Sequence, residues 1–374
     1  MVLGAFLPVG AESPGKRCGG LEMKNALRAL YVAGLLSVGG AHAALAAQPA
    51  CDRACLEGFV EKYLDAVVAD DPKLVPISPN VKFTEDGQRL LIGDGLWNTA
   101  KAKGKYRLFV TDVPAQQVAV LATIQEDHKE AAQFNGSLLA LRLRVRDGQI
   151  TEIEQMVVRG ASDNNNRTFN TVDGMATNPL YLTPVPPGQR ASRAELIAAA
   201  NKYFSGMQKN DGKGDYNFTD DCVRNENGGQ STAVPLQPGQ KMPDPKTATM
   251  YSANWSCKQQ FQSGLLHFVN RIRDRRYVAV DEERGIVFAF GFFDHSGGQT
   301  RHFKTPDGRD IVAGPVQPYT WEIAELFKLE KGNIRKIDAF LQRVPYGMNS
   351  GWSTWEQGMS DQARDVTMEA PAGI

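Results

Sequence analysis

The chain has 374 residues, of which 42% are hydrophobic and 22% are charged, and lysine plus arginine balance aspartate plus glutamate at 42 each. Balanced charge supplies no basic field, so the composition argues against a nucleic-acid-binding protein. The length and apolar content suffice for two cores of ordinary size and suit a small, uncharged or mildly polar ligand.

The first 47 residues have the layout of a secretory signal behind a short extension. A basic start at residues 23–28 precedes the apolar run ALYVAGLLSVGG and the small residues AHAALAAQPA, which place cleavage near residues 43–47. Residues 1–22 fit poorly before such a signal, so we expect the true start at Met23 and a signal peptide over residues 23–47. The apolar run is short for a membrane span, so a stable membrane anchor is the less favoured alternative to a periplasmic or secreted protein.

Four cysteines follow the signal, namely Cys51, Cys55, Cys222 and Cys257. An even number in an exported chain indicates disulfides, and three pairings are possible. We favour Cys51–Cys55 with Cys222–Cys257, because each bond then stays inside one half of the chain. The alternative is a zinc site, but no Cys-x-x-Cys pair occurs and no histidine lies at ligand spacing, so we expect no metal and no cofactor.

Four segments recur in the same order in two halves of the chain. The matched pairs are residues 60–72 with 200–212, 81–88 with 222–230, the strands that end in Asp-His at 127–128 and 294–295, and 144–159 with 328–343. The last pair aligns Ile153 with Ile337 and Glu154 with Asp338. Each half is therefore predicted to contain one amphipathic helix, a strand with a turn, a loop-rich middle and three long strands joined by hairpins.

These patterns predict an α+β protein of two tandem cone-shaped domains, each a curved antiparallel sheet wrapped on helices. The predicted boundaries are 48–182 for the first domain, 183–191 for a proline-rich linker, 192–349 for the second domain and 350–374 for a tail on the surface. Ser192 and Glu195 form a capping box that begins the second helix.

The strands DGQITEIEQ and KGNIRKIDAF, each with a Gly-x-Ile start and a downstream carboxylate, resemble the final strand of the nuclear transport factor 2-like superfamily, which includes ketosteroid isomerase, scytalone dehydratase and SnoaL-like cyclases. The segments DDCVRNENG and IRDRRYVAVDEERGIVFAFGFFDH are similar to secreted tandem members. The resemblance covers roughly residues 51–346 and implies an intramolecular pseudo-dimer, with further self-association left open. It does not imply one reaction, because the fold hosts many enzymes and also binding proteins.

The strand over residues 285–295 is apolar on both faces, as expected of a strand buried on both sides. We assign Phe288, Phe290, Phe292 and Asp294 to the lining of the cone, and the small residues with His295 to a face that packs closely against either a helix or the other half. Asp294 and His295 are candidate catalytic groups, with His295 handling a proton. The alternative is that both are simply the first solvated residues at the strand end. The first-half copy, His128, is a candidate binding residue.

Other candidates each have a structural alternative. His267 lies near Arg271, Arg273, Arg275 and Arg276, which could together hold an anion or could form a solvated strand paired with Asp274, Glu282 and Glu283. Asp338 and its copy Glu154 are candidate general bases or salt-bridge partners. Tyr203 and Tyr63 are candidate hydroxyl donors or core residues, and Trp97 and Trp255 are candidates for a pocket wall or for the core.

The chain has no phosphate loop, nucleophile elbow or dinucleotide motif, so the predicted chemistry uses acids, bases and oriented donors. We predict an exported, cofactor-independent lyase or dehydratase, or an isomerase, that acts on a small cyclic or aromatic substrate in the second cone. The alternative is a non-catalytic small-molecule-binding or scaffold protein with an apolar cavity. Convergent ionisable groups inside the cone would favour catalysis.

Overall fold

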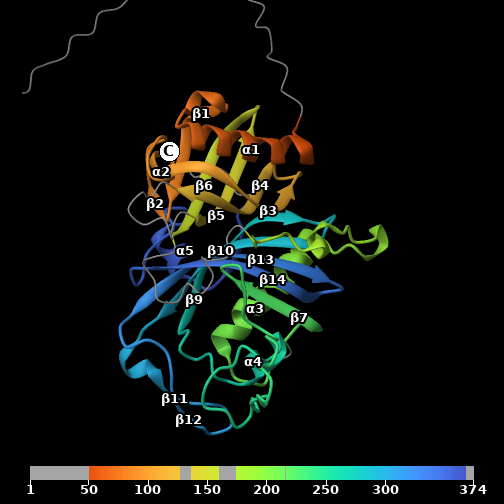
Figure 1. Ribbon diagram of the computed structural model, residues 1–374, viewed down its shortest axis with the longest axis vertical. Coiled ribbons are helices and arrows are strands. Elements are labelled where there is room, and N and C mark those ends of the chain that lie inside the picture. Colours follow the sequence, from red (N-terminus) through yellow and green to blue (C-terminus); the bar gives the residue numbers. More distant parts are fainter. Residues whose placement is uncertain (1–49, 127–135, 160–173, 215, 368–374) are drawn as a thin grey trace, which may run out of the picture. The chain divides into compact units, whose positions relative to one another are not determined.

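The computed structural model describes residues 50–126, 136–159, 174–214 and 216–367. Residues 47–374 cluster as one compact unit, and its described part holds two large sheets and one two-stranded sheet (Figure 1). The α+β class is thereby confirmed. The predicted signal peptide and His128 lie outside the described residues, and the division of residues 48–349 into two domains stays a prediction.

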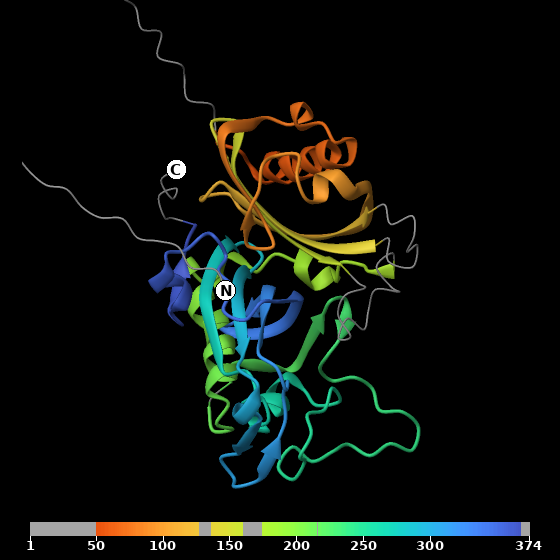
Figure 2. The ribbon, with the colours of Figure 1, turned by 90° about the vertical axis from the view of Figure 1, so that its left-hand side faces the viewer.

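The first large sheet has six strands in the order β2-β1-β6-β5-β4-β3. Its strands are β1 (Ile77–Glu85), β2 (Gln88–Arg89), β3 (Ala100–Asp112), β4 (Gln117–Glu126), β5 (Gly136–Arg146) and β6 (Gln149–Arg159). The short helix η1 (Pro72–Leu74) precedes β1, and α2 (Leu96–Thr99) lies between β2 and β3. Helix α1 (Arg53–Ala69) begins at Asp52, whose carboxylate accepts a hydrogen bond from the Cys55 amide, and ends at Asp70 in the left-handed region. Figure 2 shows the sheet curving around α1, and the helix buries its apolar side against the sheet.

The second large sheet has seven strands in the order β15-β9-β10-β13-β14-β7-β8. Its strands are β7 (Phe218–Glu226), β8 (Gly229–Gln230), β9 (Arg271–Asp281), β10 (Ile286–His295), β13 (Tyr319–Glu330), β14 (Asn333–Val344) and β15 (Ala363–Asp365). The remaining elements are η4 (Pro179–Leu182), η5 (Pro187–Gln189), α3 (Arg193–Lys209), α4 (Cys257–Gln262), η6 (Gly298–Arg301), β11 (His302–Lys304), β12 (Asp310–Val312) and α5 (Trp355–Met359). Helix α3 begins with the predicted capping box of Ser192 and Glu195.

The two large sheets share one strand order once β15 is set aside, as the sequence repeats predict. Their register agrees as well. Ile153 of β6 pairs with Phe83 of β1, and Ile337 of β14, which the sequence repeat aligns with Ile153, pairs with Arg224 of β7. Both of these pairings are parallel, and β15 also pairs parallel with β9, so the prediction of antiparallel sheets is wrong at one strand pair in the first sheet and at two in the second. In the chain, β6 is separated from β1 by the other strands of its sheet, and it then lies beside β1 and runs in the same direction. β14 lies beside β7 in the same way.

Two further features differ from the sequence prediction. Each half has four long strands after its loop-rich middle rather than three, because β3 and β9 are rich in lysine, glycine or arginine and do not show a strand-like apolar pattern. The C-terminal segment is not a tail on the surface. It adds β15 to the edge of the second sheet, where Ala363 pairs with Arg275, and it buries Ser350 and Thr367.

A third hydrophobic cluster joins the faces of the two sheets that point away from α1 and α3. It contains Tyr106, Leu121 and Met156 from the first half and Phe288 and Phe290 from the second. The assignment of the phenylalanine row to the cone lining is therefore wrong, since Phe288 and Phe290 pack between the sheets. Val287, Ala289 and Phe293 pack toward α3, as the helix alternative for the small-residue face predicts. A strand that is apolar on both faces carries no signal of which face meets the helix.

Both favoured disulfides are confirmed. Cys51 is bonded to Cys55 beside the start of α1, and Cys222 of β7 is bonded to Cys257 of α4, with Cα atoms 5.2 and 5.8 Å apart. None of the described helices is long and apolar enough to cross a membrane.

Candidate functional site

An open groove with a volume of about 570 Å³ lies where β13 and β14 meet the β7–β8 turn. Aromatic side chains form much of its wall, namely Tyr251, Phe268, Tyr319 and Trp321. Polar groups at the wall include Glu226, and Arg343 stacks over the Tyr319 ring at 4.3 Å. We call this feature the aromatic groove. Its walls suit a planar or cyclic molecule that carries a polar substituent.

One guanidinium organises the polar wall of the groove. Arg224 is buried on β7 and donates to the Tyr251 hydroxyl at 2.7 Å and to the Gln260 side-chain oxygen at 2.9 Å. On its other side, Nε lies 3.0 Å from the Glu226 carboxylate, whose side chain is 36% exposed. The guanidinium therefore holds a phenol and a carboxylate at the same wall, and both belong to residues that line the groove.

Behind this wall lies a second acid. Arg224 also donates to the Tyr203 hydroxyl at 3.3 Å, and Glu325 of β13 is buried close to that hydroxyl. Burial raises the pKa of Glu325 to about 8, while the Arg224 guanidinium opposes the rise. Burial also raises the pKa of Tyr251 to about 12. At neutral pH, Glu325 and Tyr251 are therefore both protonated.

The register of the two sheets shows that this network is specific to the second half. With Ile153 aligned to Ile337, Arg224 takes the place of Phe83, and Glu325 takes the place of Leu141. Phe83 and Leu141 are core residues that pack under α1. Arg224 and Glu325 are buried at positions where the first sheet has apolar residues, and burying a charged or ionisable group carries a desolvation cost. Such a cost is typical of a site kept for function.

His295 lies beside the groove but does not line it. Its imidazole is fully buried, stacked on Tyr319 at 4.6 Å and in edge contact with Trp321 at 4.8 Å. Nδ1 is 3.0 Å from the Phe293 carbonyl, and Nε2 has no hydrogen-bond partner among the residues described. Burial lowers the pKa of His295 to about 4, so the ring is neutral at pH 7 and is separated from the groove by aromatic side chains.

Asp294 and three of the clustered arginines form structural pairs. Asp294 is fully buried and accepts from Arg271 at 2.5 Å, from Arg273 at 2.8 Å and from the Thr320 hydroxyl at 2.6 Å. Arg275 points to α3 and donates to the Ser205 hydroxyl at 2.9 Å. Two of the arginines therefore share Asp294, while Arg275 and Arg276 point elsewhere, so the four do not converge on one anion. The predicted pairing with Asp274 is found for Arg276 at 3.3 Å, but the strand is buried rather than solvated.

Asp338 and Glu154 face the space between the sheets and not the interior of a cone. Asp338 accepts hydrogen bonds from Tyr181 at 2.5 Å and from Asn225 at 2.8 Å, and burial raises its pKa. Glu154 accepts from Arg276 at 2.7 Å, across the two halves. Of the two predicted alternatives, the salt bridge is therefore confirmed for Glu154, which pairs with Arg142 and Arg276. Both residues share a face with Phe288 and Phe290, and alternation fixes which residues share a face but not which face is inside.

The remaining candidates lie apart. Tyr63 is core and donates to Gln155 at 2.9 Å, Trp97 packs on Tyr63, and Trp255 is buried under a loop and donates to the Pro243 carbonyl at 2.6 Å. His267 is partly buried, which lowers its pKa, and its ring lies 5.4 Å from Phe303. Of the predicted site residues, Tyr203 alone belongs to the network of Arg224.

Sequence reasoning missed Arg224, Glu226, Tyr251 and Glu325. A signal was present for the first two, because Arg224 and Glu226 are two residues apart on a strand and so share a face, while the aligned position of Arg224 in the first half is apolar. Tyr251 lies in an insertion without a counterpart in the first half, so no pattern in the sequence could place it at the groove.

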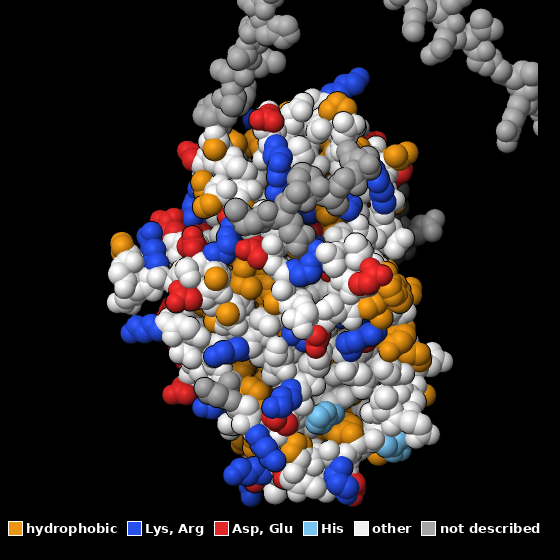
Figure 3. Space-filling view, turned by 180° about the vertical axis from the view of Figure 1, so that it is seen from behind, with side chains coloured by type: hydrophobic (Ala, Val, Ile, Leu, Met, Phe, Trp, Pro, Cys, Tyr) orange, Lys and Arg blue, Asp and Glu red, His pale blue; other side chains and the backbone are white. Residues whose placement is uncertain are grey.

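Charged and apolar side chains are interspersed on the face of the molecule that Figure 3 shows, in keeping with the balanced composition. No group of three or more histidine, cysteine, aspartate or glutamate side chains within the described ranges is placed to hold a metal ion.

Comparison with known proteins bears mainly on the second half. The family model described as "Domain of unknown function (DUF8021)" matches residues 189–341, from just before α3 into β14. No curated protein matches the chain. Two solved structures are similar at 13% identity. One is a de novo designed protein with a curved β-sheet, with a TM-score of 0.23 and coverage of 41% of this chain and 88% of that chain. The other is AclR, a candidate hydroxylase from Streptomyces galilaeus, with a TM-score of 0.25 and coverage of 41% of this chain and 83% of that chain.

Proposed function

We propose that the second half is a cofactor-independent enzyme that performs acid–base chemistry on a small cyclic or aromatic molecule in the aromatic groove, as a dehydratase or a related lyase. The observation that carries this proposal is the pairing of the Tyr251 hydroxyl and the Glu226 carboxylate on the Arg224 guanidinium. Both residues line a groove whose walls are aromatic.

An elimination needs a base for a carbon-bound proton and an acid for the leaving group. Glu226 is the exposed carboxylate and accepts the proton from the carbon next to a carbonyl, as the C–H and C–O bonds break and a C=C bond forms. Tyr251 is protonated at neutral pH, since burial raises its pKa to about 12, and donates a proton to the hydroxyl that leaves as water. Arg224 stabilises the phenolate that results, and solvent returns the proton from Glu226 to Tyr251.

A second candidate is a binding protein without catalysis, and one observation favours it. The space between α3 and the second sheet is filled by Tyr203, Phe204, Phe261 and Phe327, whose ring centroids lie 5.3 to 5.6 Å apart in the contacting pairs. The ligand site is therefore an open groove at the end of the sheet rather than an enclosed cone, and open sites exclude water less well.

The test is a screen of small cyclic hydroxy-carbonyl and phenolic compounds, with both thermal shift and product formation measured. Wild type is compared with Tyr251→Phe and Glu226→Gln, and with Tyr346→Phe as a control at an exposed tyrosine outside the groove. Catalysis predicts that each groove variant loses about 10²–10⁴-fold in turnover while the control does not. Binding without turnover, weakened only by the groove variants, would establish the second candidate, and binding that none of the variants affects would contradict both.

We also infer that the two halves are tandem copies of one cone-shaped domain of the nuclear transport factor 2-like superfamily, and that the protein is exported. The shared strand order and register support the duplication. The two disulfides, together with the signal-like N-terminal segment, support export. Sequencing of the mature N-terminus after secretion tests the export directly, with a start near residue 48 expected and a retained Met23 contradicting it.

A further inference from the structure

One cation at the wall of the aromatic groove has no partner within the described part of the protein. Arg343 is an exposed residue of β14, and its guanidinium carbon lies 4.3 Å from the centre of the Tyr319 ring. It forms no hydrogen bond or ion pair with any residue that the structure describes. Glu226 lines the same groove, but its carboxylate is bonded to Arg224 instead. The charge of Arg343 is therefore open to a ligand.

The equivalent arginine of the first half is surrounded by carboxylates. The sequence repeat and the strand register both align Arg159 of β6 with Arg343 of β14. The Arg159 guanidinium lies 2.9 Å from the carboxylate of Glu126, 3.2 Å from that of Glu85 and 3.7 Å from that of Asp86. An arginine at this place in the fold therefore binds carboxylates where the chain supplies them.

The second half keeps the arginine but has neutral residues in place of two of these carboxylates. The paired strands place His295 at the position of Glu126, which differs from the match read from the sequence at this strand end. Asn227 takes the place of Asp86 at the turn after the first strand of each sheet. An imidazole or an amide carries no negative charge in either of its ordinary forms, so neither residue can pair with Arg343 as a carboxylate does.

The third carboxylate is kept but is bonded elsewhere. Glu226 takes the place of Glu85. It lies 3.0 Å from Arg224, at a position where the first half has the apolar Phe83. Arg224 thus takes up the one carboxylate that the second half retains at these three positions, and Arg343 is left with the flat face of an aromatic ring. A guanidinium placed in this way is suited to a carboxylate that comes from a ligand.

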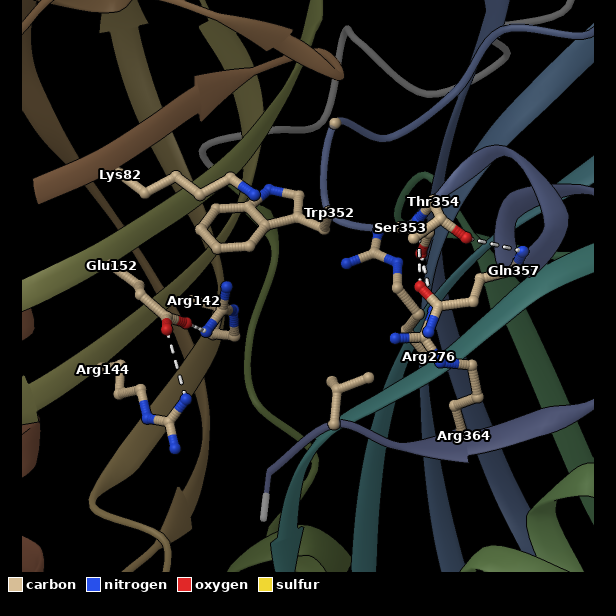
Figure 4. Close-up of a pocket in the computed structure, with 12 residues that line it drawn as sticks. Lys82, Arg142, Arg144, Glu152, Arg276, Trp352, Ser353, Thr354, Gln357 and Arg364 are labelled. Carbon is tan, nitrogen blue, oxygen red and sulfur yellow. Dashed lines mark hydrogen bonds and ion pairs between the residues drawn. The ribbon is translucent and has the colours of Figure 1, made fainter. Parts of the chain in front are cut away.

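Arginines at another cavity of the protein lack this feature. This cavity has a volume of about 370 Å³ and lies beside the C-terminal segment. Figure 4 shows Glu152 bonded to both Arg142 and Arg144 there, at 2.6 and 3.2 Å. These two cations are paired within the protein, so they do not single out a ligand. Arg343 differs because it lines a groove without such a carboxylate among the described residues.

We propose that the aromatic groove takes a cyclic or aromatic carboxylic acid, whose carboxylate is bound by the Arg343 guanidinium. This inference rests on the proposed function, because it names the substrate class of the same groove. The planar fork of an arginine can donate two parallel hydrogen bonds to the two oxygens of a carboxylate, and stacking on Tyr319 limits the orientations of that fork. The aromatic walls cover the ring of such a ligand. The carboxylate takes no part in bond breaking and holds the ligand while Glu226 and Tyr251 act.

The experiment is calorimetric titration of the full chain with benzoate and benzamide, which share a shape but differ in charge. Arg343→Gln removes the guanidinium, and Arg343→Lys keeps a positive charge without the planar fork. Arg89→Gln is the matched control, because Arg89 is an exposed arginine of β2 that does not line the groove. Thermal melts check that each variant is folded.

We expect benzoate to bind wild type and Arg89→Gln equally, Arg343→Gln to bind it at least about tenfold more weakly, and Arg343→Lys to lie between them. Benzamide should bind wild type more weakly than benzoate does, and its affinity should not change in the variants. If Arg343→Gln does not fold, a loss in Arg343→Lys that is confined to benzoate makes the same case.

Three results would overturn the proposal: no benzoate binding to wild type, equal benzoate affinity in folded Arg343→Gln, or an equal loss of benzoate and benzamide in that variant. The last result would mean that the arginine only shapes the groove. Each of these leaves the turnover test of Tyr251→Phe and Glu226→Gln unaffected. Conversely, wild-type turnover in those two variants, with benzoate binding still dependent on Arg343, would refute the proposed chemistry and leave the carboxylate assignment standing.

Discussion

The buried imidazole of His295 should make the stability of the protein depend on pH. Burial holds its pKa at about 4, against 6.5 for an ordinary histidine. Below pH 6.5 the unfolded chain therefore binds a proton that the folded chain excludes until about pH 4, and stability falls as the pH falls through this window. Lowering the pH from 7 to 4.5 should cost about 2 kcal/mol through this one group.

The assay is urea unfolding of wild type and His295→Phe at pH 7 and pH 4.5. Phenylalanine keeps the aromatic packing on Tyr319 and Trp321 but cannot take up a proton. Each protein is compared with itself at the two pH values, so the cost of the substitution cancels, and wild type should lose about 2 kcal/mol more than the variant. The exposed His302, changed to phenylalanine, is the control and should behave like wild type. Equal losses in wild type and His295→Phe would refute the reasoning.

Three other substitutions test the buried charges and the long disulfide. Asp294→Asn leaves the fully buried Arg273 without its carboxylate and should lower the free energy of unfolding by about 3–5 kcal/mol in urea titrations, while a loss under about 1 kcal/mol would show that the pair is dispensable. Glu325→Gln should raise the free energy of unfolding at pH 7 by about 3 kcal/mol and have little effect at pH 4.5. The reason is that the buried acid, with its pKa near 8, must take up a proton on folding at pH 7. An effect of the substitution that does not change with pH, measured by the same titrations, would argue against this explanation. Replacing both Cys222 and Cys257 by alanine removes a bond across a sequence separation of 35 and should cost about 4 kcal/mol by calorimetry, with an unchanged melting temperature as the contrary result.

The repeated architecture could be predicted from the sequence because its signals are local. The capping box of Ser192 begins α3 as predicted, and the hairpin turns at Gly148 and Gly332 have φ of 70° and 77°, which glycine adopts without strain. The cysteine pairing followed from keeping each bond in one half.

The interior of the second half could not be predicted in the same way. The strand of Phe288 to His295 is apolar on both sides, so alternation separates its faces without showing which one meets α3. The Arg224 network joins β7, β13 and the loop of Tyr251, and contacts between segments so far apart leave no trace in local pattern. The arginines of β9 looked like one cluster in sequence, but a bulge at Asp274, where φ is 49°, sends them in different directions.

The most direct test of the central claim, that the aromatic groove is the ligand site of the second half, is a crystal structure after soaking in concentrated phenol. Phenol is a suitable probe whatever the natural ligand is, because it matches both the aromatic wall and the polar groups. The account predicts phenol in the groove beside Tyr319 and Trp321, with its hydroxyl within hydrogen-bond distance of Tyr251 or Glu226. A groove that stays empty while phenol occupies other sites would contradict it.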